Sequence, residues 1–211
     1  MLKIRYLNEH DVKTVAQMRL DHWQTVYRGM VDDDYLDGLT LEKLIAEVGL
    51  YVNVVDELLE IFSDRFEEDK ENVDNIVETL KRLQVHAVIA ENESQEILGF
   101  CTFGYRWIKS GDIYNFNDYD YIIHEIYVTQ ALRKRGIGRK LIGFVFKEAW
   151  KHGQKKVLLK VHAQNENAID FYKKIGGYVL GKSEVELGDK TYPQVVIGFQ
   201  LECRTFRTYG F

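Results

Sequence analysis

Hydrophobic and polar positions change their spacing along the 211-residue chain, and the changes mark the expected elements. Residues 2–7 alternate as a β-strand does. Asn8, with Asp11 three residues later, is typical of the start of a helix, which we expect to reach about Tyr27. Apolar residues recur at helical spacing over 41–48 and again over 58–80. The first 84 residues therefore predict one strand followed by mostly helical chain.

The remainder of the chain changes between strand and helix patterns. Residues 85–91 and 97–107, joined by a polar turn, predict a β-hairpin. At 45% hydrophobic residues, with one proline and no glycine- and serine-rich tract, the chain is most simply a single domain over 1–211. The fold class is α/β with a mixed sheet, with further strands at 120–128, 156–161, 178–187 and 191–201 and helices at 137–152 and 166–175.

A glycine-rich turn lies between the strand pattern that ends at Val128 and the helix pattern that follows. It reads Arg133-Lys134-Arg135-Gly136-Ile137-Gly138. Two glycines within three residues let the backbone approach a ligand closely, and the free N–H groups of the next helical turn point at that ligand. Phosphate is the ligand that this arrangement favours.

Basic residues gather in and after this turn. Residues 133–160 hold ten lysines and arginines and one acid, in a chain whose net charge is −5. A basic run is also typical of nucleic-acid binding, but the overall acidity favours a small polyanion and no nucleic-acid partner. Because a helix N-terminus contributes only about 0.3–1 kcal/mol toward an anion, the side-chain cations have to supply much of the phosphate affinity.

Two other phosphate-binding motifs are disfavoured by their surroundings. Residues 176–183 match the P-loop pattern G-x-x-x-x-G-K-[ST]. A P-loop leaves a strand and enters a helix, whereas this match leaves a helix pattern and enters a strand pattern. The dinucleotide pattern G-x-G-x-x-G fails at Leu141, where it requires its third glycine.

The segment Arg133-x-x-Gly136-x-Gly138 resembles the pyrophosphate-binding motif R/Q-x-x-G-x-G/A of the GNAT superfamily of acetyl-CoA-dependent N-acetyltransferases. After the strand at 156–161, the block Asn165-x-x-Ala168-Ile169-x-Phe171-Tyr172-x-Lys174-x-Gly176 resembles the superfamily's segment beside the pantetheine arm. Residues 11–36 are similar to the opening helices of many bacterial members. The resemblance covers about 95–200 and, more loosely, 1–45, whereas residues 49–84 have no counterpart in it.

The resemblance implies a GNAT-like fold, with a mixed, mostly antiparallel sheet flanked by helices and an acidic helical insertion at 49–84. It implies acetyl-CoA as the cofactor and direct transfer of its acetyl group to a primary amine in a ternary complex. It also implies Tyr172 as the acid that protonates the leaving thiolate. The residues that it assigns to the cofactor are Ile126, Tyr127, Val128, Arg133, Lys134, Arg135, Gly136, Ile137, Gly138, Arg139, Lys140, Asn165, Ala168, Phe171 and Tyr172.

The transfer also needs a base. An alkylamine with a pKa of ~10.4 is almost wholly protonated at neutral pH, and releasing its proton costs about 4–5 kcal/mol. Glu125 is the first candidate for a catalytic base, because it lies on the strand just before the phosphate turn. Strand alternation places the neighbouring His124 on the opposite face, so that only one of the two faces the cleft. An ordinary structural role for Glu125 is the alternative.

The acceptor is less closely defined by the sequence. Trp23 and Tyr27 end the first long helix, where the family lines its acceptor cleft, although Trp23 can equally belong to the core. Residues 56–78 hold ten acids and two bases, and 109–121 mix aromatic and acidic residues. Both segments suit a cationic amine, but solvated helices and a self-packed loop explain them as well. We expect a small-molecule amine; a protein or peptide amine, or a cofactor-binding sensor without turnover, are the alternatives.

Cysteine usage and hydropathy bear on the cellular setting. Cys101 and Cys203 lie far apart without metal-ligand spacing, which favours reduced thiols and no metal site. No apolar run is long enough to span a bilayer, and residues 1–5 read as a strand rather than a signal sequence. We expect a cytoplasmic protein with no membrane partner. The C-terminal aromatic residues can cover the domain's own sheet or a second subunit, which leaves a homodimer open.

Overall fold

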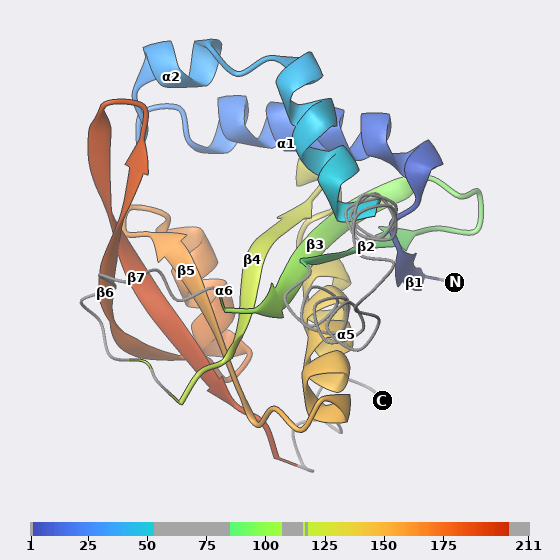
Figure 1. Cartoon of the computed structure of the whole chain (residues 1–211), viewed down its shortest axis with the longest axis vertical. Coiled ribbons are helices and arrows are strands. Elements are labelled where there is room, and N and C mark those ends of the chain that lie inside the picture. The colour runs from blue at the N-terminus through green and yellow to red at the C-terminus, as the bar shows by residue number, and fades with distance from the viewer. Residues whose placement is uncertain (1, 53–84, 107–115, 117, 203–211) are drawn as a thin grey trace, which may run out of the picture.

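A computed structural model of the chain describes residues 2–52, 85–106, 116 and 118–202. Seven strands form one sheet in the order β1-β2-β3-β4-β5-β7-β6 (Figure 1). Neighbouring strands are antiparallel except β4 and β5, which are parallel. The expected mixed, mostly antiparallel sheet is therefore confirmed. Its strands are β1 (Lys3–Tyr6), β2 (His86–Glu91), β3 (Ile97–Tyr105), β4 (Tyr121–Val128), β5 (Lys156–His162), β6 (Tyr178–Leu187) and β7 (Lys190–Gln200).

Helices cover both faces of the sheet (Figure 1). On one face α5 (Ile137–Lys151) and α6 (Glu166–Lys174) enclose the larger core, in which the side chains of α5 pack on those of β3, β4 and β5. On the other face α1 (Val12–Val26) and the helical residues 41–52 enclose a smaller core. The sheet thus separates two sides of the molecule, which we call the α5 side and the α1 side.

The start of α1 follows the prediction made from Asn8 and Asp11. The Asn8 side chain accepts a hydrogen bond from the backbone N–H of His10, and the Asp11 carboxylate accepts one from the backbone N–H of Asn8. From this capping box a short 3-10 helix (Glu9–Asp11) leads into α1, whose buried residues are Val15, Ala16 and Arg19. An arginine at a core position requires a buried partner, because burying an unpaired charge is costly.

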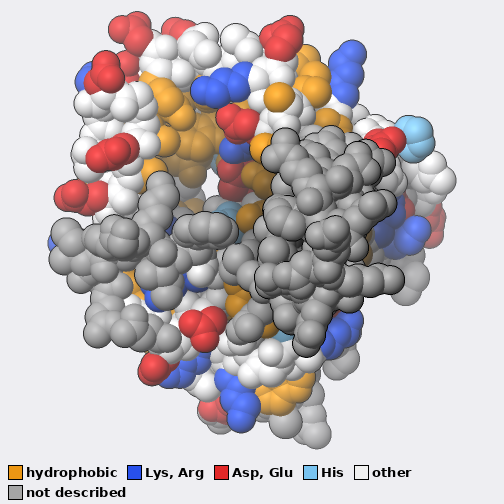
Figure 2. Space-filling view, viewed as in Figure 1, with side chains coloured by type: hydrophobic (Ala, Val, Ile, Leu, Met, Phe, Trp, Pro, Cys, Tyr) orange, Lys and Arg blue, Asp and Glu red, His pale blue; other side chains and the backbone are white. Residues whose placement is uncertain are grey.

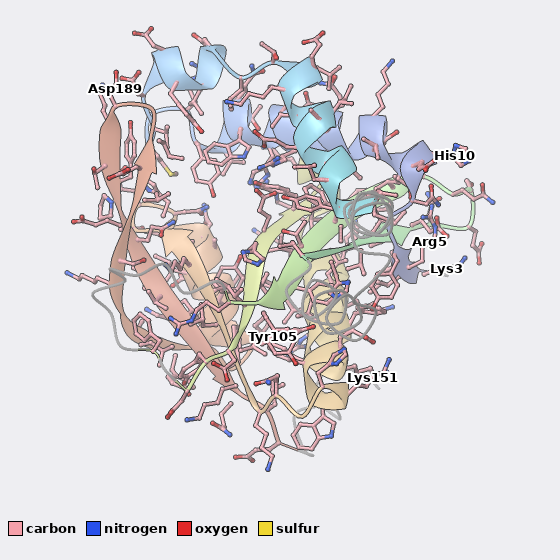
Figure 3. The ribbon with its side chains drawn as sticks, in the orientation of Figure 1. Lys3, Arg5, His10, Tyr105, Lys151 and Asp189 are labelled. Atoms are coloured by element: carbon pink, nitrogen blue, oxygen red, sulfur yellow. The ribbon has the colours of Figure 1, made fainter. Side chains whose placement is uncertain are left out.

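The chain between α1 and α2 (Asp33–Asp37) is fastened to the β6–β7 hairpin. The backbone N–H of Asp32 donates to the Tyr192 hydroxyl at 2.9 Å, and the Asp32 carboxylate pairs with Lys190. Figure 3 places Asp189 at the tip of this hairpin, on the side of the molecule away from Lys3 and Arg5. The space-filling view shows a hollow below α1 and α2, with hydrophobic side chains on its walls (Figure 2).

Other expectations are settled by the described residues. Residues 176–183 leave α6 and enter β6, so the P-loop match lacks the strand-to-helix setting of a P-loop. Tyr119 and Tyr121 are buried in the core, which favours the self-packed reading for their part of the aromatic segment. Residues 53–84 of the insertion expected over 49–84, the residues 107–115 and Cys203 lie outside the described residues. Among the described helices, none has the length and apolar content needed to cross a membrane.

Candidate active site

A gap opens between β4 and β5. Parallel pairing joins only Tyr121–Ile123 to Val157–Leu159, whereas β4 stays paired to β3 as far as Val128. Beyond Ile123, the edge of β4 that faces β5 therefore carries backbone N–H and C=O groups that do not pair with β5. Such an edge can bind an extended, amide-containing ligand in the way that an added strand is bound. Ile126, Tyr127 and Val128, predicted to contact the pantetheine arm, lie along this edge.

The glycine turn follows β4 as the sequence predicts. A short 3-10 helix (Gln130–Leu132) leads to Gly136, which caps α5 with a left-handed φ of 83°. Helical bonding begins with the Lys140 N–H donating to the Gly136 carbonyl at 3.1 Å, so the N–H groups of Ile137 and Gly138 precede the hydrogen-bonded part of the helix. These donors fit a pyrophosphate, and the exposed side chains around them are Arg133, Lys134, Arg135 and Lys140.

The second block lies beside this turn. Asn165 caps α6, since its side-chain oxygen accepts a hydrogen bond from the Ala168 N–H at 3.2 Å. A Cβ atom on Gly138 would lie 3.3 Å from Cζ of Phe171, so the missing side chain lets the turn and α6 approach closely. Tyr172 is 7% exposed, and burial raises the pKa of its hydroxyl. Tyr172 therefore keeps its proton at neutral pH, as a general acid must.

Glu125 is held from the α1 side by an arginine. Arg19 donates from Nη2 to Glu125 Oε1 and from Nη1 to Glu47 Oε2, each at 2.6 Å. The other oxygen of Glu125, Oε2, is buried and has no hydrogen-bond partner among the described residues. Burial raises the pKa of Glu125, against the lowering effect of Arg19. Glu125 thus presents a free carboxylate oxygen with increased proton affinity, which suits a general base.

Strand alternation fails at His124. Thr102 pairs with Glu125 but Phe103 pairs with Ile123, so a β-bulge accommodates His124 as an extra residue. Tyr121 and Ile123 contact the α5-side core, and after the bulge Ile126 and Val128 contact it again. The expectation that His124 and Glu125 take opposite faces was therefore wrong, because it counted each residue as one step of a regular strand.

Aromatic side chains from the end of α1 lie near Glu125. The rings of Trp23 and Tyr27 stack with their centres 4.7 Å apart, and Trp23 also contacts Tyr35. Burial and the charge of Glu125 raise the pKa of Tyr27, while a hydrogen bond with the Asn165 side chain lowers it. Tyr27 is thus close to both Glu125 and the second block, whereas Trp23 packs between two core clusters.

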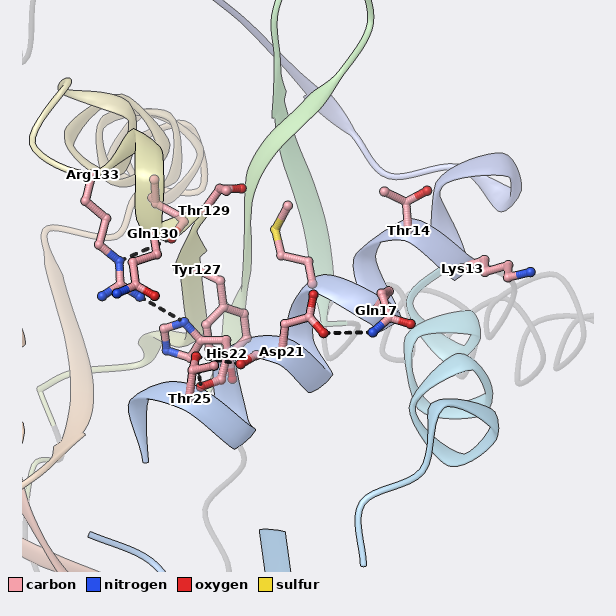
Figure 4. Close-up of a pocket in the computed structure, with 12 residues that line it drawn as sticks. Lys13, Thr14, Gln17, Asp21, His22, Thr25, Tyr127, Thr129, Gln130 and Arg133 are labelled. Atoms are coloured by element: carbon pink, nitrogen blue, oxygen red, sulfur yellow. Dashed lines mark hydrogen bonds between the residues drawn. The ribbon is translucent and has the colours of Figure 1, made fainter. Parts of the chain in front are cut away.

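A surface groove of about 580 Å³ lies between α1 and the chain around the end of β4 (Figure 4). At one end the Arg133 guanidinium contacts Nδ1 of His22 and the Val128 carbonyl, each at 3.3 Å. Burial and the charge of Arg133 lower the pKa of His22 to about 3, so Nδ1 accepts this hydrogen bond from Arg133. Arg133, the first residue of the phosphate motif, therefore also contacts His22 of α1. The other walls are formed by Lys13, Thr14, Gln17, Met18, Asp21, Thr25, Tyr127, Thr129 and Gln130.

Sequence reasoning did not single out Arg19 or Glu47. A signal for Arg19 was present, since it occupies the apolar face of α1 with Val15 and Ala16, where a charged residue is unusual. Glu47 meets Arg19 because residues 41–52 pack beside α1, and no local pattern indicates that contact.

Comparison with known proteins identifies the family. The model of the acetyltransferase (GNAT) family matches residues 53–178, which is more than half of the chain. The chain belongs to the GNAT family. It is an acetyl-CoA-dependent N-acetyltransferase, so the alternative of a sensor without turnover is not favoured.

Related GNAT proteins cover the chain to different extents. YuaI of Bacillus subtilis, described as an uncharacterized N-acetyltransferase, is 22% identical over 200 residues, which are 94% of this chain and 93% of YuaI. YjaB of Escherichia coli, described as a peptidyl-lysine N-acetyltransferase, is 32% identical over 74 residues, which are 35% of this chain and 47% of YjaB.

Solved GNAT structures share the fold along nearly the whole chain. PaiA N-acetyltransferase from Thermoplasma acidophilum, in complex with coenzyme A, has a TM-score of 0.58 and 19% identity over 95% of this chain and 99% of that one. The protein yncA from Salmonella typhimurium, described as a putative acetyltransferase and solved with its cofactor acetyl-CoA, has a TM-score of 0.57 and 16% identity over 96% of this chain and 95% of that one. These two structures hold coenzyme A and acetyl-CoA, which confirms the predicted acetyl-CoA cofactor.

Proposed function

We propose that this GNAT enzyme acetylates the primary amine of a small cationic molecule and that Glu125 removes the proton from that amine. The observation that carries the proposal is the buried Oε2 atom of Glu125, which has no hydrogen-bond partner among the described residues. Burial, and after it the charge of Glu125, raises the pKa values of Tyr27, Tyr51 and Tyr127, so these phenols lie within range of that charge. A carboxylate among aromatic rings suits an ammonium group.

The charge balance supports a cationic acceptor. The cluster holds one positive group, Arg19, and two negative groups, the buried Glu125 and the partly exposed Glu47. An ammonium ion would bring the cluster to neutrality, and desolvation would favour loss of its proton to the nearby carboxylate. The contacts of Asp32 with the β6–β7 hairpin close the hollow on one side. A hollow that is closed on one side suits a small molecule better than a large one.

A lysine side chain of a protein or peptide is the second candidate acceptor. It is itself a primary alkylamine and presents the same group to Glu125. The observation that favours it is the 32% identity to YjaB, described as a peptidyl-lysine N-acetyltransferase, over 74 residues.

In the proposed reaction acetyl-CoA supplies the acetyl group as a thioester. The N–H groups of Ile137 and Gly138 and the basic side chains of the turn bind its pyrophosphate, while Asn165, Ala168 and Phe171 contact the pantetheine arm. Backbone N–H groups at the open β4 edge bind the pantetheine amides and the thioester oxygen. Glu125 takes one proton from the ammonium group, and the free amine forms a bond to the thioester carbon. The C–S bond breaks as Tyr172 gives its proton to the leaving thiolate, and the second proton released by the nitrogen replaces it on Tyr172. Because a thiol has a pKa of ~8.5, this acid helps turnover without being indispensable.

The test is acetyl-CoA turnover, read as free thiol release, with polyamines, aminoglycosides, amino acids and short peptides. We expect one amine class to support release and Glu125→Gln to lower kcat by about 10²–10⁴-fold. Glu47→Gln is the matched control, since it removes the other carboxylate bound to Arg19, and it should stay within a few-fold of wild type.

Equal losses in the Glu125→Gln and Glu47→Gln variants would assign both carboxylates to holding Arg19 and remove Glu125 as the base. Release with lysine peptides alone would replace the small molecule by the second candidate. The cytoplasmic location and the homodimer stay predictions.

A further inference from the structure

His162 ends β5, on the wall of the gap opposite β4. Val157, Leu159 and Val161 contact the α5-side core, so alternation turns His162 to the α1 side. The parallel register sets Ile123 level with Leu159. Because the bulge at His124 adds one residue to β4, the continued register sets His162 level with Tyr127, two residues beyond Glu125. His162 and Glu125 therefore lie on opposite walls of the gap and on the same side of the sheet.

His162 is a buried hydrogen-bond donor. It is 5% exposed, and its Nδ1 atom accepts a hydrogen bond from the Gln164 N–H at 3.2 Å. Nδ1 therefore carries the lone pair, and the proton of the neutral ring is on Nε2. Burial lowers the pKa of His162, which keeps the ring neutral. Nε2 is shielded from water and has no hydrogen-bond partner among the described residues.

Tyr27 is close to both walls. Its ring centre lies 6.2 Å from that of His162, and its pKa responds to the charge of Glu125. Tyr192 borders the imidazole as well, with ring centres 5.8 Å apart. Beside Tyr27 the cleft thus holds one buried acceptor, Glu125 Oε2, and one buried donor, His162 Nε2, and the described residues satisfy neither.

We propose that the acceptor carries, beside its amine, a neutral oxygen that accepts a hydrogen bond from His162 Nε2. The proposal rests on the proposed function, in which Glu125 receives the amine. It also requires the Tyr27 ring to move aside when the ligand enters. A hydroxyl or an amide carbonyl fits better than a carboxylate, because Glu125 and Glu47 already outnumber Arg19. Amino alcohols, aminosugars and amino amides meet this requirement, whereas simple alkylamines and polyamines do not.

The size of the preference follows from the buried donor. Nε2 is unpaired in the free enzyme and stays unpaired beside a ligand without the oxygen, whereas an oxygen-bearing ligand satisfies it. The cost of such an unpaired group, converted at about 1.4 kcal/mol per tenfold, corresponds to about 5- to 150-fold in affinity. The same preference is expected in kcat/KM for matched acceptors.

The test compares amines that differ only in the oxygen. Calorimetry with the CoA-saturated enzyme measures affinity for cyclohexylamine, 2-aminocyclohexanol, 2-aminocyclohexanecarboxamide and 2-aminocyclohexanecarboxylate, and for the linear set based on butylamine. Thiol release is measured with acetyl-CoA for the same amines. In the wild-type enzyme we expect the hydroxyl or amide member of a set to bind about 5- to 150-fold more tightly than the parent amine.

Three variants show whether His162 causes the difference. His162→Phe keeps a ring without the donor and should abolish it, whereas His162→Gln keeps an N–H donor and should retain part of it. The control His86→Phe changes a histidine on β2, away from the gap, and should leave it intact.

Equal affinity within each set, a difference that survives His162→Phe, or no binding of any oxygen-bearing amine would overturn the proposal. Thiol release with equal affinities would refute the proposal alone and leave the proposed function standing. A His162-dependent preference in binding without thiol release would support the oxygen contact and refute the proposed function.

Discussion

Arg19 is the positive charge that partners Glu125, and replacing it by methionine tests that role while keeping much of the side-chain volume. Arg19 is 9% exposed and binds Glu125 and Glu47, each at 2.6 Å. Breaking a buried ion pair from one side typically costs about 3–5 kcal/mol, because the remaining charge stays buried. The Glu47 side chain is 39% exposed, so its half of the interaction contributes only about 0–1 kcal/mol. We expect Arg19→Met to lower the free energy of unfolding by about 3–5 kcal/mol at pH 8.

The loss has a defined pH dependence. Burial already raises the pKa of Glu125, and removing Arg19 raises it further. A carboxyl group whose pKa is higher in the folded than in the unfolded state binds protons more tightly when folded. Stability is therefore greatest below the unfolded value of ~4.3 and falls as the pH rises toward the folded pKa. Arg19→Met should lose less stability at pH 5, where Glu125 can take up a proton, than at pH 8.

Urea unfolding followed by circular dichroism at both pH values measures the effect. Arg28→Met is the control, since Arg28 pairs with Asp33 and Asp37 at the surface and its loss should leave the unfolding midpoint near that of wild type. An equal loss at pH 5 and pH 8 would show that packing of the arginine stem matters rather than its charge. An unchanged midpoint at both pH values would refute the buried ion pair.

Three further substitutions have expected outcomes. Tyr172→Phe should lower turnover with little change in acetyl-CoA affinity, since only the proton donor is lost; unchanged thiol release would remove Tyr172 from the mechanism. Gly177→Ala should destabilise the fold by about 1–3 kcal/mol, because a Cβ would lie 2.7 Å from Cγ2 of Ile197 and 2.8 Å from the Tyr172 carbonyl oxygen; a wild-type urea midpoint would contradict this. Gly136→Asp should weaken acetyl-CoA binding in calorimetry by about tenfold or more, because the residue has a φ of 83° and the new side chain is negatively charged. The control Gly153→Asp, at a φ of 73° beyond the end of α5, should bind acetyl-CoA as wild type does. Equal affinities of the two variants would remove the glycine turn from the phosphate site.

The elements with one buried face were predictable from sequence. The spacing of apolar residues placed α5 and α6 to within one residue at either end, because each buries a regular stripe against the sheet. The resemblance assigns the two motifs at 133–138 and 165–176 to one cofactor. The fold brings them together where Gly138 faces Phe171.

The electrostatics of Glu125 were not predictable in the same way. Its partners Arg19 and Glu47 come from segments distant in the chain, and only the packing of helices on the α1 side makes them neighbours. The bulge at His124 results from the register between β3 and β4, which the alternation of β4 alone does not contain. The unpaired state of His162 Nε2 likewise depends on what surrounds the end of β5.

The short parallel seam between β4 and β5 has a consequence for folding. Strands β1 to β4 and strands β5 to β7 each form an antiparallel group, and three residue pairs of the seam join the two groups, with α5 packed on both. Hairpins between neighbouring segments form quickly, whereas parallel pairing across a long connection forms slowly. We expect the hairpins β2–β3, β3–β4 and β6–β7 to form before the seam closes. Acetyl-CoA bound across the gap would contact both groups of strands, and the loaded enzyme should unfold more slowly than the free enzyme.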